Sequence, residues 1–289
     1  MIVTYGSQSM VYPLRIVLVR RPDASFAVAD PATWGYSSRP NLEIAQTEHD
    51  AVVAMLRKSG ADVRYHEAPQ PGRADAIFVH DPAIVTDRGA VLLRMGKDLR
   101  RGEENAIGKA FENLGVPILA TLRAPATAEG GDLLWVDHDT LAVGQGFRTN
   151  EEGLRQLTEV LKRLGVRTVR VPLPYFRGPA ACLHLMSLIS IVAEDLAVVY
   201  PRLLPVPFRT YLKAEGFDFV EVSDPEFDSM APNVLAVRAR DCIMLAGNPI
   251  TQTRLEEAGC RVRTYRGNEI SLKAEGGATC LTRPVLRRR

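Results

Sequence analysis

The amino-acid sequence predicts an α/β protein, a pseudo-symmetric five-bladed propeller of ββαβ units. Five segments each contain an amphipathic helix that stops at a glycine and is followed by a short strand. Paired apolar runs of strand length precede several of these helices. Five such units closed into a ring would place their strand ends around a central channel, where polar side chains from every unit converge.

The five helix–strand segments end their helices in the same way. Each stop glycine stands where the C-terminus of a helix favours a residue in the left-handed conformation. Successive stop glycines are 43 to 55 residues apart, near the upper end of the periods that indicate repeat arrays and propellers. The segments cover residues 51–67, 106–122, 157–173, 209–223 and 253–267, and their glycines are Gly60, Gly115, Gly165, Gly216 and Gly259.

The apolar runs before the helices come in pairs. A doubly wound sheet has the same β-α-β order, and the order alone leaves that alternative open. Such a sheet has one strand per helix, so paired strands favour the propeller. We expect residues 1–289 to form a single catalytic domain of this kind. The paired runs are residues 76–85 and 90–95 before the second helix, 132–136 and 140–144 before the third, and 233–237 and 242–247 before the fifth.

The composition is that of a globular protein with a sizeable core, since 46% of the 289 residues are hydrophobic. A formal net charge of +2 argues against an electrostatic nucleic-acid surface. No long apolar run is free of charge, and the first basic residues follow the apolar stretch, whereas in a signal peptide they precede it. We therefore expect a cytoplasmic protein with neither a nucleic-acid nor a membrane partner.

The four cysteines are too widely spaced for a CxxC pair and too few for a disulfide scaffold. Neither a structural metal site nor a cofactor is expected. Cys182, Cys242 and Cys260 are typical of small buried hydrophobic residues. Cys280 follows a glycine pair and is the candidate nucleophile, a role that requires a histidine brought close by the fold.

Polar residues interrupt the apolar runs at the ends of the predicted units. Glycine pairs beside some of them allow the backbone to approach a ligand closely. Each polar residue also has an ordinary structural explanation. A histidine among leucines, for example, is more often a hydrogen-bonded core residue than a functional one. The residues are His80 and Asp81 in ADAIFVHDPAIV, Glu129 and Asp132 in AEGGDLLWV, His184 in ACLHLMSLIS and Cys280 in AEGGATCLTRP.

Taken together, these motifs resemble the dimethylarginine dimethylaminohydrolase family of the guanidine-modifying superfamily, which also includes arginine deiminases and amidinotransferases. The resemblance covers nearly the whole chain and implies the pentein fold, a five-bladed α/β propeller. The residues that carry it are, in order, Asp75, Asp81 in FVHD, Arg100 in RRGEE, Glu129 in EGGD, Arg148 in RTN, His184 in LHLMS and Cys280 in GGATC.

The resemblance implies a role for each of these residues. Cys280 would be the nucleophile and His184 the general acid and base, with Glu129 as a third catalytic residue. Asp81 and Glu129 would bind the guanidinium, while Asp75, Arg100 and Arg148 would fix the amino-acid end of the substrate. The chemistry is consistent, because a guanidinium carbon is a poor electrophile and requires a thiolate. The field of the substrate cation and of His184 would favour that thiolate.

The implied reaction is hydrolysis of an Nω-methylated arginine to citrulline and an amine through a covalent amidino-cysteine. Deimination of arginine and transfer of the amidino group to an acceptor amine are alternatives within the superfamily. A non-catalytic propeller that binds cationic amino acids is an alternative from another class. Deiminases and amidinotransferases typically place an aspartate two residues after the catalytic histidine, where this chain has Met186, which favours the dimethylargininase branch. The expected partner is a small guanidino amino acid, and a homodimer stays open.

His80 departs from the family pattern, which has an acidic residue there. If residues 80–81 belong to a strand, His80 faces away from Asp81 and only orients the loop. If the chain bends there, the imidazole reaches the site as a specificity residue that titrates near neutral pH. Residues 29–41, rich in proline, glycine and serine, are a candidate closing loop or an ordinary surface loop.

Overall fold

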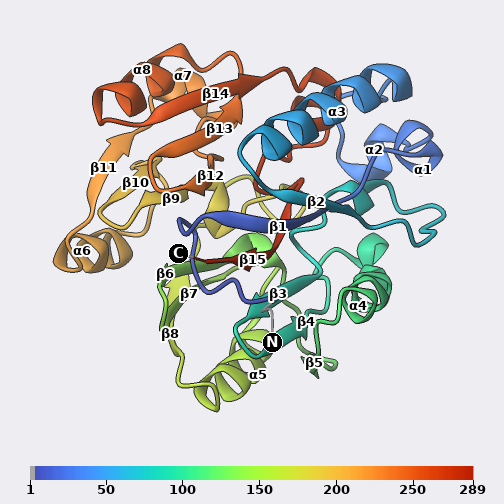
Figure 1. Cartoon of the computed structure of the whole chain (residues 1–289), viewed down its shortest axis with the longest axis horizontal. Coiled ribbons are helices and arrows are strands. Elements are labelled where there is room, and N and C mark those ends of the chain that lie inside the picture. The colour runs from blue at the N-terminus through green and yellow to red at the C-terminus, as the bar shows by residue number, and fades with distance from the viewer. Residues whose placement is uncertain (1–3, 289) are drawn as a thin grey trace.

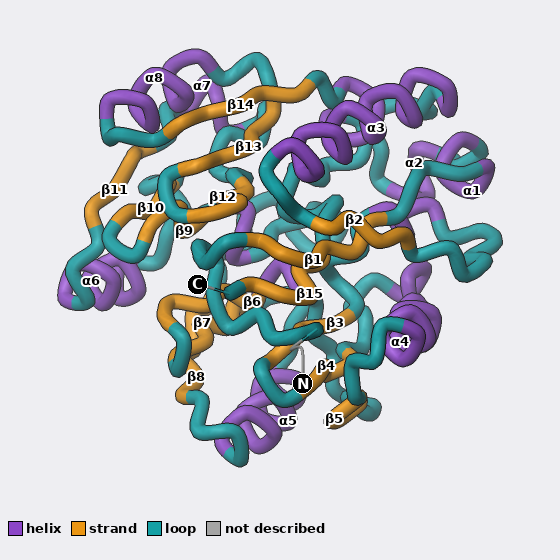
Figure 2. Tube along the Cα trace, viewed as in Figure 1, coloured by secondary structure: helices purple, strands orange, loops and turns teal. Residues whose placement is uncertain are grey.

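The computed structural model describes residues 4–288 and contains five three-stranded sheets arranged around a centre (Figure 1). The strands lie toward the middle of the molecule, and the longer helices lie on its outside (Figure 2). The predicted propeller of five α/β units is confirmed. No helix within residues 4–288 is both long and apolar enough to span a bilayer.

The third sheet illustrates the repeated unit. Strands β6 (Leu133–Asp137) and β7 (Thr140–Gln145) form an antiparallel hairpin, and β8 (Arg167–Pro172) pairs in parallel with β7. Helix α5 (Glu151–Lys162) makes the crossover that a parallel pair requires. It buries one face against the sheet through leucines spaced by three and four residues.

Three other sheets repeat this order. In each of them an antiparallel hairpin is followed by a helix and a strand parallel to the second strand of the hairpin. They contain β3 (Ala83–Thr86), β4 (Gly89–Leu92), α4 (Glu103–Asn113) and β5 (Ile118–Thr121); β9 (Ile189–Ala193), β10 (Leu196–Val199), α6 (Val206–Ala214) and β11 (Asp218–Glu221); and β12 (Leu235–Arg238), β13 (Asp241–Leu245), α8 (Pro249–Glu257) and β14 (Arg261–Tyr265).

The remaining sheet closes the ring because it joins the two ends of the chain. Strand β1 (Leu14–Val19) pairs antiparallel with β15 (Arg283–Arg287) and parallel with β2 (Asp62–Tyr65), which follows helix α3 (Leu42–Lys58). Strand β15 therefore runs through the centre of the molecule (Figure 1). Short helices α1 (Ala24–Ala27), α2 (Pro31–Trp34) and α7 (Asp224–Phe227) lie in connecting segments.

The stop glycines behave as predicted. All five follow the long helices with φ between +72° and +92°, a conformation that costs glycine little and strains other residues. A glycine at the end of a helix is a local signal, and for this reason the five units can be recognised from the sequence.

One predicted strand is wrong. Residues 74–77 form a 3-10 helix, η1 (Ala74–Ile77), and the strand begins only at Ala83. The run is apolar because it is buried near the centre of the molecule. Pro82 follows the turn and has no backbone N–H to donate to a strand partner. His80 and Asp81 therefore lie in a turn before β3, and the alternation of strand side chains does not apply to them.

Candidate active site

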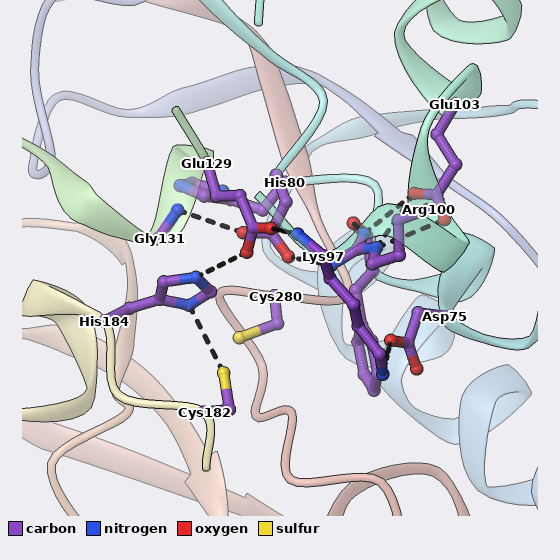
Figure 3. A network of polar contacts seen from close by, with 12 residues as sticks. Asp75, His80, Lys97, Arg100, Glu103, Glu129, Gly131, Cys182, His184 and Cys280 are labelled. Carbon is purple, nitrogen blue, oxygen red and sulfur yellow. Dashed lines mark hydrogen bonds and ion pairs between the residues drawn. The ribbon is translucent and has the colours of Figure 1, made fainter. Parts of the chain in front are cut away.

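Each of the five units contributes one polar residue to the centre, from the segment just before the first strand of its hairpin. Asp81 precedes β3, Glu129 precedes β6, His184 precedes β9, Asn233 precedes β12 and Cys280 precedes β15. Ring closure brings these equivalent positions together, and the Cys280 side chain points toward His184 (Figure 3). Asn233 was not predicted, although its place in the repeat is a signal that could have found it.

Glu129 is the most completely satisfied group of the site. Its Oε1 accepts hydrogen bonds from the backbone N–H groups of Gly96 and Lys97, each at 2.9 Å. Its Oε2 accepts from Arg148 Nη1 and from His184 Nε2, each at 2.8 Å. Burial favours the neutral acid, but the charge of Arg148 and the bond from His184 outweigh it and hold the pKa well below its usual value. All four contacts are made within the protein, so Glu129 orients His184 and Arg148. The predicted direct hydrogen bond from Glu129 to the substrate guanidinium has no support in these contacts.

His184 is fixed from several sides. Its Nε2 is committed to Glu129, and its Nδ1 lies 3.7 Å from Cys182 Sγ. Gly131 lies so close that a Cβ atom there would collide with the imidazole, which explains the glycine in this motif. Burial opposes the charge, but Cys182, Glu129 and Asp132 raise the pKa of His184 well above its ordinary value. These neighbours therefore favour the protonated imidazolium.

Cys280 is held by the neighbouring unit. Asn233 Nδ2 donates to its sulfur at 3.4 Å, and Asn233 Oδ1 accepts from the hydroxyl and backbone N–H of Thr279. Burial, together with the charge of Asp81, raises the pKa of the thiol to about 11 although His184 acts to lower it. His184 alone therefore does not supply the expected thiolate at neutral pH, and a further cation is required.

Arg100 lies deep under the site. It is 2% exposed, and its Nη1 contacts Asp81 Oδ2 at 2.6 Å. Its Nε and Nη2 donate to Glu103, and Nη2 also donates to the carbonyl of Phe78. The guanidinium binds these protein groups, and Arg100 also lines the cavity that Asp75, Arg148 and Cys280 line, so its contact with a substrate carboxylate stays a prediction.

Replacement of Arg100 should destabilise the fold. Arg100→Met leaves Asp81 and Glu103 buried without their cation and is expected to lower the free energy of unfolding by about 3–5 kcal/mol. Urea denaturation measures the change. The neighbouring Arg101 pairs with exposed Asp98, so Arg101→Met should change stability by less than about 1 kcal/mol. Equal effects of the two variants would contradict a buried role for Arg100.

Asp75 and Arg148 line the same cavity as Cys280. Asp75 Oδ1 accepts from the Tyr36 hydroxyl at 2.7 Å, and Oδ2 pairs with Lys97 Nζ at 2.6 Å. The segment 29–41 forms part of the cavity wall through residues 32–35, and Tyr36 attaches it to Asp75, so the segment lies beside the site. Lys97 was not singled out in the sequence, where nothing marks it as different from other lysines.

His80 is buried and turned toward β15. Its Nδ1 lies 2.9 Å from the carbonyl oxygen of Thr282, and Arg283 Nη2 lies 3.1 Å from the same nitrogen. Burial and the charge of Arg283 lower the pKa of His80 to about 3. The low pKa argues against a group that titrates near neutral pH. His80 nevertheless lines a cavity together with His184 and Cys280, so its role as a specificity residue stays a prediction.

The other cysteines divide into two kinds. Cys242 and Cys260 are buried in the apolar core, as predicted. Cys182 was expected to be inert packing, but it lines the cleft beside His184. That expectation is wrong because the chain between β8 and η4 (Leu185–Ser187) passes over the site. No group of side chains suited to a metal ion occurs within residues 4–288.

The five-unit fold and the central cysteine, histidine and carboxylates define an enzyme of the guanidine-modifying superfamily. The family model described as N,N dimethylarginine dimethylhydrolase, eukaryotic, matches residues 28–287. The chain belongs to the dimethylarginine dimethylaminohydrolase family and is a hydrolase that acts on C–N bonds of amidines.

Similar proteins support this membership. The N(G),N(G)-dimethylarginine dimethylaminohydrolase of Streptomyces coelicolor is 31% identical over 280 residues, which cover 93% of this chain and 96% of that protein. A cysteine-to-serine variant of the Pseudomonas aeruginosa enzyme complexed with citrulline has a TM-score of 0.79 at 26% identity, over 94% of this chain and 99% of the other. A histidine-to-glycine variant of a dimethylarginine dimethylaminohydrolase, as an adduct with S-methyl-L-thiocitrulline, has a TM-score of 0.78 at 26% identity, over 93% and 99%.

Proposed function

We propose that this enzyme hydrolyses Nω-methylated arginine to citrulline and methylamine or dimethylamine through a covalent amidino-cysteine on Cys280. The observation that carries the proposal is the pairing of His184 with Glu129. It commits Nε2 and leaves Nδ1 on the side of the cleft that Cys280 lines. The citrulline complex and the thiocitrulline adduct of related enzymes support the same product and a covalent step.

Substrate binding supplies the cation that the thiol requires. Asp81 lines the cavity. Its oxygens accept from Arg100 and from the backbone N–H of Gly131, and their remaining lone pairs would face the planar guanidinium. The pKa of Cys280, raised to about 11 by burial, would fall when that positive charge lies beside the sulfur. Because His184 is already protonated, the thiol releases its proton to solvent water in the cleft, and the thiolate attacks the guanidinium carbon to form a tetrahedral adduct.

His184 then moves protons in both halves of the reaction. As an imidazolium it donates the Nδ1 proton to the departing amine, the C–N bond breaks, and the amidino group remains on Cys280. Neutral His184 next takes a proton from water, whose oxygen attacks the same carbon. The O–H proton of this second adduct passes to the sulfur as the C–S bond breaks, so the ureido product leaves, the Cys280 thiol is restored and His184 is again protonated. Asn233 donates to the sulfur and is placed to stabilise the thiolate in both steps.

His184→Gly tests this sequence of steps. With S-methyl-L-thiocitrulline as substrate, methanethiolate is a good leaving group and needs little protonation, so the adduct should form. Its hydrolysis needs a base and should slow by about a hundred-fold or more. Mass spectrometry should therefore find a stable adduct on Cys280 in this variant.

Two results would contradict the proposal. One is an adduct on Cys182 in place of Cys280. The other is rapid formation of citrulline by His184→Gly with no adduct. The double variant His184→Gly with Cys280→Ser is the matched control and should carry no adduct.

A further inference from the structure

A second cavity meets the cleft at the reacting groups. This cavity, which we call the side chamber, has a volume of about 120 Å³. It shares Cys182, His184, Glu275 and Cys280 with the cavity that contains Asp75, so the two cavities meet at the nucleophile and the general acid. The proposed chemistry gives no role to the large apolar side chains that line the side chamber.

These apolar side chains form a packed wall. The Phe227 ring stacks on Tyr200 with 4.0 Å between ring centres, and it meets the Phe176 ring edge-on at 5.9 Å. Met186 is buried in the adjoining core. A wall of this kind favours an apolar group over water. The large apolar residues that line the side chamber are Phe176, Leu183, Met186, Phe227, Met230 and Pro232.

The backbone is strained around the side chamber. Phe176, Met230 and Glu275 have φ angles of +51°, +60° and +57°, in the left-handed region that disfavours residues with a Cβ atom. All three line the side chamber, and within residues 4–288 the only other residue with positive φ that is not glycine is Arg240. Such conformations persist where the surrounding structure holds them, and they cluster at ligand-binding sites. The cluster therefore indicates that the side chamber binds a ligand group.

The shape of the substrate directs its Nω-substituent toward this chamber. Asp75 and Arg148, predicted to bind the amino-acid end, line the other cavity and not the side chamber. An arginine that extends from that end brings its guanidinium to the junction of the two cavities. Its ω-nitrogens lie on the side of the guanidinium carbon that faces away from the chain. With that carbon beside the Cys280 sulfur, a substituent on an ω-nitrogen enters the side chamber.

We propose that the side chamber binds the Nω-substituent and that an unbranched alkyl group of about three carbons fits it better than methyl does. A methyl group leaves most of the chamber unfilled, since an apolar cavity of about 150 Å³ holds a whole benzene molecule. Arg177 and Asp228 also line the chamber, but they pair with each other at 3.0 Å and are exposed, so they lie at its mouth.

The inference rests on the proposed function for the reaction itself, which is unchanged. His184 protonates the nitrogen that carries the alkyl group, the bond from that nitrogen to the guanidinium carbon breaks, and the alkylamine leaves. Water then releases citrulline from Cys280 as before. The products of Nω-propyl-L-arginine are therefore citrulline and propylamine.

The test varies the length of the substituent. Calorimetry with Cys280→Ser gives the dissociation constants of Nω-methyl-, Nω-ethyl- and Nω-propyl-L-arginine without turnover, and formation of citrulline gives kcat/KM for the native enzyme. Each added methylene should strengthen binding and raise kcat/KM by about three-fold, because it removes apolar surface from water.

Two variants change the size of the side chamber in opposite directions. Ala181 lines the chamber and is half-buried, so Ala181→Leu should fill it and abolish the preference for propyl over methyl. Leu183→Ala should enlarge the chamber and extend the gain to Nω-butyl-L-arginine. Ala214→Leu, exposed at the end of α6, is the matched control and should keep the native preference. Each result is a ratio between ligands within one variant, so a general loss of activity does not affect it.

Equal binding of the three ligands by Cys280→Ser, or weaker binding of the longer ones, would overturn the proposal. A native ratio of propyl to methyl in Ala181→Leu would also overturn it, because the substituent would then lie outside the side chamber. The proposed reaction fails separately, if the native enzyme forms no citrulline from any of the three ligands while their affinities still rise with chain length.

Discussion

Cys280→Ser is expected to lower kcat by roughly a thousand-fold or more while the protein stays folded. A serine hydroxyl is far less acidic than a thiol, and even a guanidinium cation beside it would not generate enough alkoxide to attack a poor electrophile. The residue lies in a loop before β15 and contacts Asn233, so the isosteric change leaves packing intact. Release of ureido product from Nω-methylarginine measures the loss, and thermal unfolding checks the fold.

Cys182→Ser is the informative comparison because Cys182 is the other thiol of the cleft. Its sulfur is near His184 Nδ1, so some change in rate is expected from altered proton transfer. Covalent labelling of Cys280 by substrate should nevertheless persist in Cys182→Ser. Turnover by Cys280→Ser together with inactive Cys182→Ser would reverse the roles of the two residues.

The repeated unit could be predicted from the sequence because its signals are local. A glycine at a helix C-terminus and a pair of apolar runs depend on a few neighbouring residues, and the left-handed conformation of Gly60 or Gly165 follows from helix geometry alone. The run before Asp81 was misassigned because apolar residues near a central channel are buried in turns as well as in strands. Because buried turns and buried strands are both hydrophobic, hydrophobicity does not distinguish a turn from a strand.

The sequence predicted which residues lie at the site better than it predicted which of them contact one another. Ring closure brings Cys280, His184 and the carboxylates together, as the resemblance implied. Which acidic and basic side chains form an ion pair depends on distances that exist only in the folded chain. The pairing of Lys97 with Asp75 therefore had no signal in the sequence. The pairing of Arg100 with Glu103 did have one, since the two residues are three apart within RRGEE. A carboxylate so close to an arginine argues against a free guanidinium.

Glu129→Gln should have the second largest effect, a fall in kcat on the order of a hundred-fold. Glu129 accepts from four donors, and a carboxamide cannot accept from all of them because its nitrogen is itself a donor. Either Arg148 or His184 must lose its contact. The loss should appear in kcat with Nω-methylarginine, since His184 acts in both halves of the reaction.

The pH dependence of kcat distinguishes an electrostatic role of Glu129 on His184 from a role in packing alone. Glu129 contributes to the raised pKa of His184, and a general acid is active below its pKa, so the native enzyme should keep its rate well above neutral pH. Loss of the carboxylate charge lowers that pKa, and the alkaline limb of the kcat profile should move to lower pH in Glu129→Gln. Glu112→Gln, exposed on α4, removes the same charge from the surface and should leave the profile in place. If the limb of Glu129→Gln coincides with that of the native enzyme while kcat still falls, Glu129 positions His184 without setting its charge. An unchanged kcat would remove Glu129 from the catalytic site altogether.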